Sequence, residues 1–281
     1  MKKKKGDFVE RTILGIVSFI KETIFSESLS RKNGFLQRRD ARFKCVSAAL
    51  LLLAILFSKN ILSLFIIYFG IIVIACFSSI GLLFFLSRTM FFVPLFSFFI
   101  VFPAIFNIVT PGEPILSFNF FNWEISITRQ GIDSAAIFFF RVLDSISVAI
   151  LLVLTTHQNI LLKTLRIFYV PKLIVMIMGM TYRYIFLFLD SVIRTFISIK
   201  SRIGFVQSTK EGQRLVAFNM ARLWLKSYNL QSQVYNAMIS RGYTGEAYVL
   251  DNFHYNWVDI VLIFMSLFLL IGTICLNLFF L

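Results

Sequence analysis

Histidine, cysteine and acidic residues are scarce in this sequence of 281 residues, which contains two histidines, three cysteines and 14 aspartates or glutamates. The histidines, His157 and His254, are nearly 100 residues apart, and the cysteines at Cys45, Cys76 and Cys275 form no CxxC pair. A transition-metal site needs clustered histidine, cysteine or carboxylate ligands. We therefore expect no metal site and no cofactor in this chain.

Motifs for catalysis are also missing. The sequence has no Gly-rich phosphate loop of the Walker type, no nucleophile elbow and no HExxH pair. We therefore expect that the chain is not an enzyme and that any nucleotide binds to a partner. The net charge of +14 does not indicate nucleic acid binding, because the basic residues are concentrated in two blocks that flank apolar segments.

Apolar residues dominate instead. They make up 58% of the chain, charged residues make up 15%, and the mean hydropathy is +0.82. These values predict an all-α membrane protein, since a chain in lipid must satisfy its backbone groups within each segment. A helix needs about 20 apolar residues to cross the bilayer. Five segments are predicted to cross, the first of them short: residues 45–57, 61–86, 90–109, 131–156 and 258–281.

Basic residues set the predicted orientation. Residues 1–44 contain twelve Lys or Arg and residues 157–257 contain twelve more, whereas the loop 110–128 contains none. We therefore expect the N-terminus in the cytoplasm and four regions along the chain. These are a cytoplasmic or interfacial N-terminal segment (1–44), a four-helix transmembrane region (45–156), a cytoplasmic region (157–257) and a last transmembrane helix (258–281).

Two stretches leave alternatives open. From Phe8 to Ile24, apolar residues recur on one side of a helical pattern, which predicts a helix in the inner membrane interface. This helix could be a plain membrane anchor or a docking site for a partner. A sixth crossing at residues 173–189 is possible, but we disfavour it because Arg183 lies near its middle and basic residues flank both ends.

The region 157–257 does not have the pattern of a compact domain. It predicts long amphipathic helices, one from Pro171 to Ile203 and one from about Gln213 to Arg241. Both helices end on a small residue, an arginine and then a glycine at or near the stop. The two ends read Ser201-Arg202-Ile203 before Gly204, and Ser240-Arg241-Gly242.

A single Arg-Gly helix end has an ordinary structural explanation. Glycine adopts the left-handed conformation that closes a helix, and the cation complements the negative end of the helix dipole. Two copies on two long basic helices favour a second explanation, in which each guanidinium enters a groove on a partner and pairs bidentately with a carboxylate. The candidate contacts with two partner subunits are therefore Ser201, Arg202, Ile203, Ser240, Arg241 and Gly242.

The second helix end lies in a stretch, residues 231–246, that resembles the signature of the transmembrane T component of energy-coupling-factor transporters, the EcfT/CbiQ family. In that family the helix ends in Ala-Arg-Gly. Here Ser replaces Ala in both copies, and Ile203 stands where the first copy has Gly. Residues 181–190 (TYRYIFLFLD) are similar to the cobalt, CbiQ-type, branch of the family. The stretch 25–44 resembles the same branch, with Ala41 in place of the usual Pro.

The resemblance implies a mechanism and a set of partners. Two ATP-binding-cassette ATPase subunits would close on ATP, the two helices would pass that motion into the membrane, and a separate substrate-binding membrane subunit would release its cargo. This chain would be a non-catalytic permease subunit of the bacterial cytoplasmic membrane, without a substrate site. The branch implies cobalt, with nickel or a vitamin as alternatives. The competing class, a self-contained secondary transporter, predicts repeated halves, and the sequence has no such repeat.

One pair of opposite charges falls within the fourth predicted span. Arg141 and Asp144 are three residues apart, so they share a helix face and can pair. Charged groups within the membrane are costly and mark function or a specific structural need. A proton or ion path is the functional alternative, whereas we favour a structural pair inside the helical bundle.

Overall fold

The chain divides into two compact units. The bundle unit comprises residues 27–161 and 252–281, and the long-helix unit comprises residues 1–26 and 162–251. The amphipathic pattern from Phe8 to Ile24 lies almost entirely outside the described residues. The structure is a computed structural model that describes residues 15, 18, 29–30, 34–90, 93–105, 113–120, 123–203, 209–245 and 256–279.

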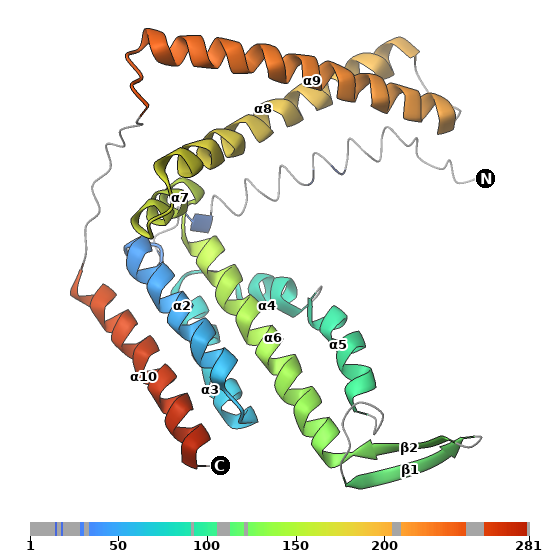
Figure 1. The fold of residues 1–281 in the computed structure, drawn as a ribbon, viewed down its shortest axis with the longest axis vertical. Coiled ribbons are helices and arrows are strands. Elements are labelled where there is room, and N and C mark those ends of the chain that lie inside the picture. Colours follow the sequence, from blue (N-terminus) through green and yellow to red (C-terminus); the bar gives the residue numbers. More distant parts are fainter. Residues whose placement is uncertain are drawn as a thin grey trace. The chain divides into compact units, whose positions relative to one another are not determined.

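The body of the bundle unit is helical. α2 packs against both α10 and α6, and α6 also packs against α3 and α5 (Figure 1). The last helix of the chain therefore lies beside the first helix of the bundle. The helices are α2 (Ala41–Phe57), α3 (Ile61–Phe77), α4 (Leu82–Met90), α5 (Val93–Ala104), α6 (Arg129–Thr155) and α10 (Trp257–Phe279).

Polar contacts at the two ends of the bundle establish the direction of its helices. At one end, the ammonium of Lys44 at the start of α2 donates to the carbonyl oxygen of Thr155 at the end of α6 (3.1 Å). At the same end, Arg39 forms an ion pair with the buried Asp259 at the start of α10 (3.9 Å). At the other end, Asn277 of α10 hydrogen-bonds to the backbone of the turn between α2 and α3. α2 and α10 are therefore parallel, and α6 runs opposite to both.

Length and composition make three of the described helical segments candidates to cross a membrane, residues 129–155, 172–195 and 257–278, with 61–77 as a shorter apolar helix. The chain leaves the bundle at the end of α6 and re-enters it at the start of α10, at the same end. Residues 172–195 include the stretch 173–189, whose crossing the sequence analysis disfavours, and by length and composition alone they qualify as a span.

The second predicted span, residues 61–86, is wrong in extent. α3 ends at Phe77, and Leu82 begins the separate short helix α4. The break occurs where Ser79 takes a φ of 54°, a left-handed conformation that a right-handed helix cannot contain. The signal for this turn is a cluster of Ser78, Ser79 and Gly81, which is weak because serine and glycine also occur inside membrane helices. The third predicted span, residues 90–109, holds α5 over only part of its length.

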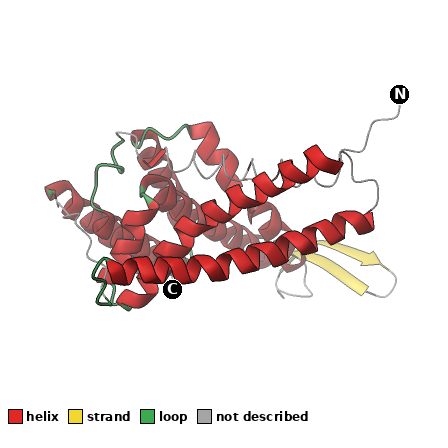
Figure 2. Ribbon diagram, turned by 90° about the horizontal axis from the view of Figure 1, so that it is seen from above, coloured by secondary structure: helices red, strands yellow, loops and turns green. Residues whose placement is uncertain are grey.

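A β-hairpin follows α5, where residues 110–128 predict a loop. β1 (Pro114–Phe120) and β2 (Trp123–Thr128) pair in antiparallel fashion and are drawn as yellow arrows in Figure 2. Polar and apolar residues alternate in both strands. This two-residue period is typical of a β-strand, so it could have predicted the hairpin from the sequence. Thr128 then begins α6, because its hydroxyl accepts the N–H of Gly131 (3.1 Å). The hairpin is a small addition to a helical membrane protein.

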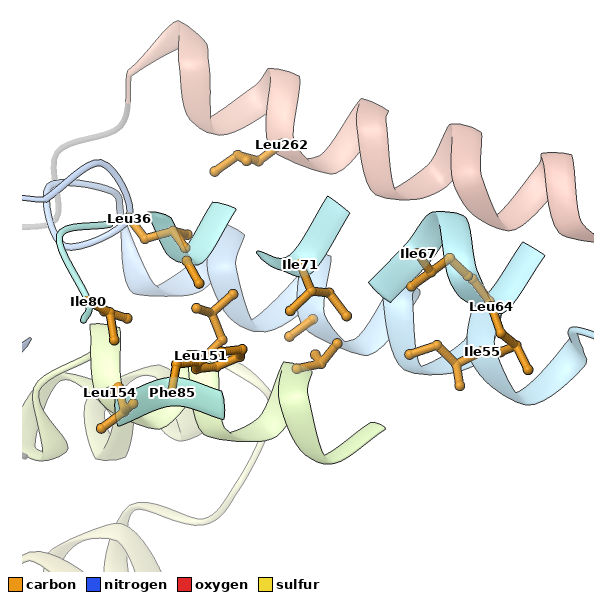
Figure 3. Close-up of a cluster of buried hydrophobic side chains, with 14 of the residues drawn as sticks. Leu36, Ile55, Leu64, Ile67, Ile71, Ile80, Phe85, Leu151, Leu154 and Leu262 are labelled. Carbon is orange, nitrogen blue, oxygen red and sulfur yellow. The ribbon is translucent and has the colours of Figure 1, made fainter. Parts of the chain in front are cut away.

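Figure 3 shows the core of the bundle unit. Fully buried side chains from four helices meet there: Ile55 of α2, Leu64 of α3, Phe85 of α4 and Leu154 of α6. From α10, Leu262 extends toward this core (Figure 3). Interlocking of this kind holds helices in fixed positions because protein interiors are close-packed.

The long-helix unit is built on α8 (Lys172–Ile203) and α9 (Thr209–Ser240), which follow the short α7 (Gln158–Ile167). α8 ends where the sequence predicts, and α9 begins four residues earlier than predicted and ends one residue earlier. Lys226 donates from α9 to the hydroxyl of Ser191 on α8 (2.9 Å). The hydroxyl of Tyr243, just after α9, donates to the sulfur of Met176 near the start of α8 (3.0 Å). The two helices therefore run antiparallel.

Candidate coupling surface

The end of α9 is closed by its own backbone. The N–H of Gly242 donates to the carbonyl oxygen of Ile239 (2.9 Å), and the N–H of Tyr243 donates to that of Met238 (3.0 Å). These two bonds form the Schellman motif, and Gly242 takes the positive φ of 80° that this motif requires. The backbone carbonyls at this end are thus satisfied without the side chain of Arg241, which is exposed.

The two candidate arginines stand on exposed helix ends. Arg202 lies one residue before the end of α8, and Arg241 directly follows the end of α9. Both side chains are exposed, and neither guanidinium forms an ion pair or a hydrogen bond with a residue that the structure describes. These ends therefore present two exposed cations that no described residue pairs.

The small residues before the arginines are occupied within their own helices. The hydroxyl of Ser201 donates to the carbonyl oxygen of Ser198, and that of Ser240 donates to the carbonyl oxygen of Asn236, each at 2.9 Å. Each serine is therefore a small residue whose hydroxyl is satisfied within its own helix. Gly204, the predicted stop of the first helix, lies outside the described residues.

The structure does not bring the two arginines together. The end of α9 contacts Met176, and Met176 and Arg202 are 26 residues apart on α8. At 1.5 Å per residue, the two helix ends are about 40 Å apart. One pocket cannot hold both guanidinium groups, so the arrangement offers two separate contact points.

α9 also exposes a stripe of large apolar side chains, which the sequence analysis did not single out. We call these five residues, between 51% and 67% exposed, the α9 stripe: Phe218, Leu225, Tyr228, Tyr235 and Ile239. Their spacing of seven, three, seven and four residues places them on one face of the helix. The opposite face carries half-buried apolar residues such as Leu223, Leu230 and Val234. This near-heptad spacing was the sequence signal that could have revealed the stripe.

Residues 34–40 fasten the start of the bundle unit to the turn after α3. The amide nitrogen of Gln37 donates to the carbonyl oxygen of Ser78 (2.8 Å), and the hydroxyl of Ser78 donates back to the amide oxygen of Gln37 (2.7 Å). The N–H of Phe35 donates to the carbonyl oxygen of Phe77 (3.2 Å). At Gly34, a Cβ atom would lie 2.7 Å from the carbonyl carbon of Ser78, so this approach requires glycine.

The variation at Ala41 has a local explanation. Asp40 is the N-cap of α2, and its carboxylate accepts the N–H of Arg42 (3.1 Å). Ala41 is then the first residue of the helix, the position at which proline fits best because its missing N–H would be unpaired anyway. Alanine fills the same position at little cost.

Arg141 and Asp144 lie inside the bundle unit but do not form the expected pair. The guanidinium of Arg141 donates to the carbonyl oxygen of Ser58, which caps the end of α2 (2.7 Å). Asp144 is completely buried, and neither of its carboxylate oxygens has a hydrogen-bond partner among the described residues. Arg141 therefore braces α6 against the turn between α2 and α3, whereas Asp144 is a separate buried acid.

Comparison with known proteins gives the family. Residues 32–250 match the family CbiQ, described as cobalt transport protein, and this range includes both arginine ends and the Gln37–Ser78 contact. The chain belongs to this family. An uncharacterised relative, MJ1571 of Methanocaldococcus jannaschii, is 36% identical over 242 residues, which cover 84% of this chain and 81% of the relative. A second uncharacterised protein of that organism, MJ1089, is 26% identical over 133 residues, covering 47% of this chain and 49% of the relative.

Membership in the CbiQ family identifies the chain as a membrane component of a cobalt-type transporter. The matched range ends before α10, yet α10 packs along the whole of α2 through contacts at both ends. Among the described residues, no three His, Cys, Asp or Glu side chains gather in one place, and His254 lies outside those residues.

Proposed function

We propose that this CbiQ family chain is the transmembrane coupling subunit of an energy-coupling-factor importer. In this role, two ATP-binding-cassette ATPase subunits bind the ends of α8 and α9. Their ATP-driven motion then passes through these helices to a separate substrate-binding membrane subunit. The chain binds no cargo and hydrolyses no ATP itself. Cobalt is the proposed cargo because the family is described as cobalt transport protein.

The observation that carries this proposal is the pair of exposed arginines on opposite ends of an antiparallel helix pair. Each helix end presents a guanidinium that is not used within the described chain, and the two are about 40 Å apart. A planar guanidinium can bind a carboxylate through two parallel hydrogen bonds, which a lysine cannot do. Two copies of one such contact at this separation suit two similar subunits better than one ligand.

The α9 stripe supports a second contact of the long-helix unit, with a partner other than the ATPases. Proteins that act alone rarely expose large contiguous apolar surfaces, so a stripe on a helix that does not cross the membrane indicates a covered surface. We propose that the substrate-binding subunit covers it. Motion of α9 would then act on that subunit directly, while the arginine ends stay bound to the ATPases.

The bundle directions support the proposed orientation. α6 ends and α10 begins at the end of the bundle that holds Lys44, and both connections to the long-helix unit leave from there. The basic blocks, residues 1–44 and 157–257, flank this same end. By the bias of basic residues, this end of the bundle is the cytoplasmic one.

The test is transport by the whole complex. The chain is expressed with its ATPases and substrate-binding subunit, as wild type, as Arg202→Ala/Arg241→Ala and as the control Arg214→Ala/Arg222→Ala, which removes two exposed arginines from the body of α9. We expect the helix-end double variant to lose ATP-driven uptake of radioactive Co²⁺ into proteoliposomes and to lose co-purification with the ATPases. Its amount in the membrane and the transport by the control should stay unchanged.

Two results would contradict the proposal. Uptake at the wild-type rate by the Arg202→Ala/Arg241→Ala complex would show that these helix ends do not couple ATP hydrolysis to transport. Uptake by this chain alone, without ATPases, would identify a secondary transporter instead. Competition of Co²⁺ uptake by Ni²⁺ or by a vitamin separates the three possible cargoes.

A further inference from the structure

The bundle unit contains an apolar cavity of about 400 Å³ lined by α2, α3, α6 and α10. Its polar lining residues are Lys44, Ser47, Thr155 and Ser266, and the other residues that line it are apolar. Ile66, Phe69 and Met265, which belong to the lining, are between 43% and 68% exposed. The cavity therefore opens onto the outer surface of the bundle, on the part that faces lipid in a membrane.

The cavity spans about one leaflet of the bilayer. Its lining runs from Val148 to Thr155 on α6 and from Ile66 to Ile74 on α3. These stretches are about 10 to 12 Å long along the helix axes. Half of the hydrocarbon thickness of a bilayer is about 15 Å. The polar end of the cavity lies at the start of α2, where residues 38–44 hold four Lys or Arg, the composition expected beside a membrane boundary.

Lys44 supplies a buried positive charge at this polar end. Lys44 is only 4% exposed, and among the residues that the structure describes its ammonium makes one hydrogen bond, to the carbonyl oxygen of Thr155. An ammonium has three donors, so two are left over. No described carboxylate lies within 4 Å of it, and the charges of Asp40 and Asp259 act on it only from farther away. A cation this deeply buried and this incompletely paired favours an anion in the cavity.

We propose that the cavity holds one acyl chain of an anionic phospholipid, with the lipid phosphate beside the Lys44 ammonium. An apolar cavity open to lipid fills with acyl chains, because an empty one forfeits the dispersion contacts of its walls. A cation near the membrane surface adds a preference for anionic lipid. This inference does not depend on the coupling function.

Photo-labelling of the full complex tests the proposal. The complex is reconstituted with phosphatidylglycerol or phosphatidylcholine carrying the same diazirine in one acyl chain, and labelled residues are mapped by mass spectrometry. We expect phosphatidylglycerol to label the cavity lining about fivefold more than phosphatidylcholine does. The exposed lipid-facing residues Phe99 and Phe268 should be labelled equally by both lipids.

Two variants separate the chain site from the headgroup site. Gly70 lines the cavity and has open space where a Cβ would be, so Gly70→Leu adds a bulky apolar side chain at the cavity wall and should abolish cavity labelling by both lipids. Its control is Gly272→Leu, an equally unobstructed glycine that does not line the cavity. Lys44→Gln keeps a donor for Thr155 but removes the charge, so labelling by the two lipids should become equal.

Three results would overturn the proposal. Equal labelling of the cavity by both lipids in the wild type would show that the site does not prefer an anionic headgroup. Labelling that Gly70→Leu does not change would show that the chain does not lie in the cavity. A disulfide between a Gly70→Cys variant and a cysteine on the substrate-binding subunit, together with loss of cavity labelling, would show that a protein partner occupies the site.

Discussion

The bundle unit buries or hydrogen-bonds many of its apolar and polar side chains, whereas the long-helix unit leaves many of them exposed. In the bundle unit, fully buried side chains from four helices form one core, and polar residues such as Lys44, Gln37 and Arg141 bond to backbone carbonyls of neighbouring segments. In the long-helix unit, α9 exposes an apolar stripe, and the guanidinium groups of Arg202 and Arg241 have no described partner. The bundle unit therefore has a packed core of its own, whereas the long-helix unit leaves apolar and charged side chains exposed.

The largest expected effect on the bundle comes from Gly34→Ala. The new Cβ would lie 2.7 Å from the carbonyl carbon of Ser78, and because that neighbour is backbone it cannot move aside without breaking the Gln37–Ser78 contact. We expect a loss of about 3 kcal/mol in the free energy of unfolding, at the upper end for overpacking. Thermal unfolding in detergent measures it, with Gly70→Ala as the unobstructed control. Equal melting temperatures for the two variants would disprove the close approach.

Arg141→Met is expected to have the next largest effect on the stability of the bundle. The change leaves the carbonyl of Ser58 without its partner from α6, which typically costs about 1 to 3 kcal/mol. We expect less protein in the membrane and a lower melting temperature, whereas Arg129→Met, at the exposed start of α6, should have no effect. Asp144→Asn is the informative companion, because Asp144 has no hydrogen bond to a described residue that the change could remove. If it destabilises as much as Arg141→Met, the two residues act as a pair after all.

The helices of this protein could be predicted where one physical signal dominates. Apolar length and amphipathic spacing predicted the two long helices and the last span to within a few residues, and Pro171 and Gly242 additionally mark the start of α8 and the end of α9. The same signals failed at Ser79, because a left-handed residue within an apolar run depends on a distant contact, that of Gln37 with Ser78. The hairpin was missed because its strands are short and lie in a loop-like composition.

The candidate site could be predicted only in part. The two arginine ends follow from local sequence, as helix ends do. Their separation of about 40 Å does not, because it depends on how α8 and α9 pair, which the Tyr243–Met176 contact reports. The spacing of Arg141 and Asp144 allowed a pair, but Arg141 bonds instead to Ser58, 83 positions earlier in the chain. Spacing along one helix predicts which side chains of that helix can pair. It does not predict whether a group on another segment, here the carbonyl of Ser58, will bind one of them instead.

The α9 stripe allows a test in which stability and binding should separate. Leu225→Ser and Tyr228→Ser remove exposed apolar area, so the unfolding of the chain alone should not change. If a partner covers the stripe, each change should weaken assembly of the complex by about tenfold, the size expected for a buried apolar contact of about 1.4 kcal/mol. Co-purification with the substrate-binding subunit measures this. The control is Leu223→Ser on the opposite, half-buried face, which should instead lower the stability of the chain.

The smallest expected effect is that of Gly242→Ala at the end of α9. No atom would obstruct the added Cβ, so the cost is purely conformational and comes from the φ of 80°, about 1 kcal/mol for a residue other than glycine. We expect faster hydrogen exchange at the N–H groups of Gly242 and Tyr243 and weaker binding of one ATPase, with the bundle unchanged. Gly272→Ala, in ordinary helical conformation, is the control. Unchanged exchange at both N–H groups would mean that the end of α9 does not depend on the left-handed turn, and that Arg241 is positioned in another way.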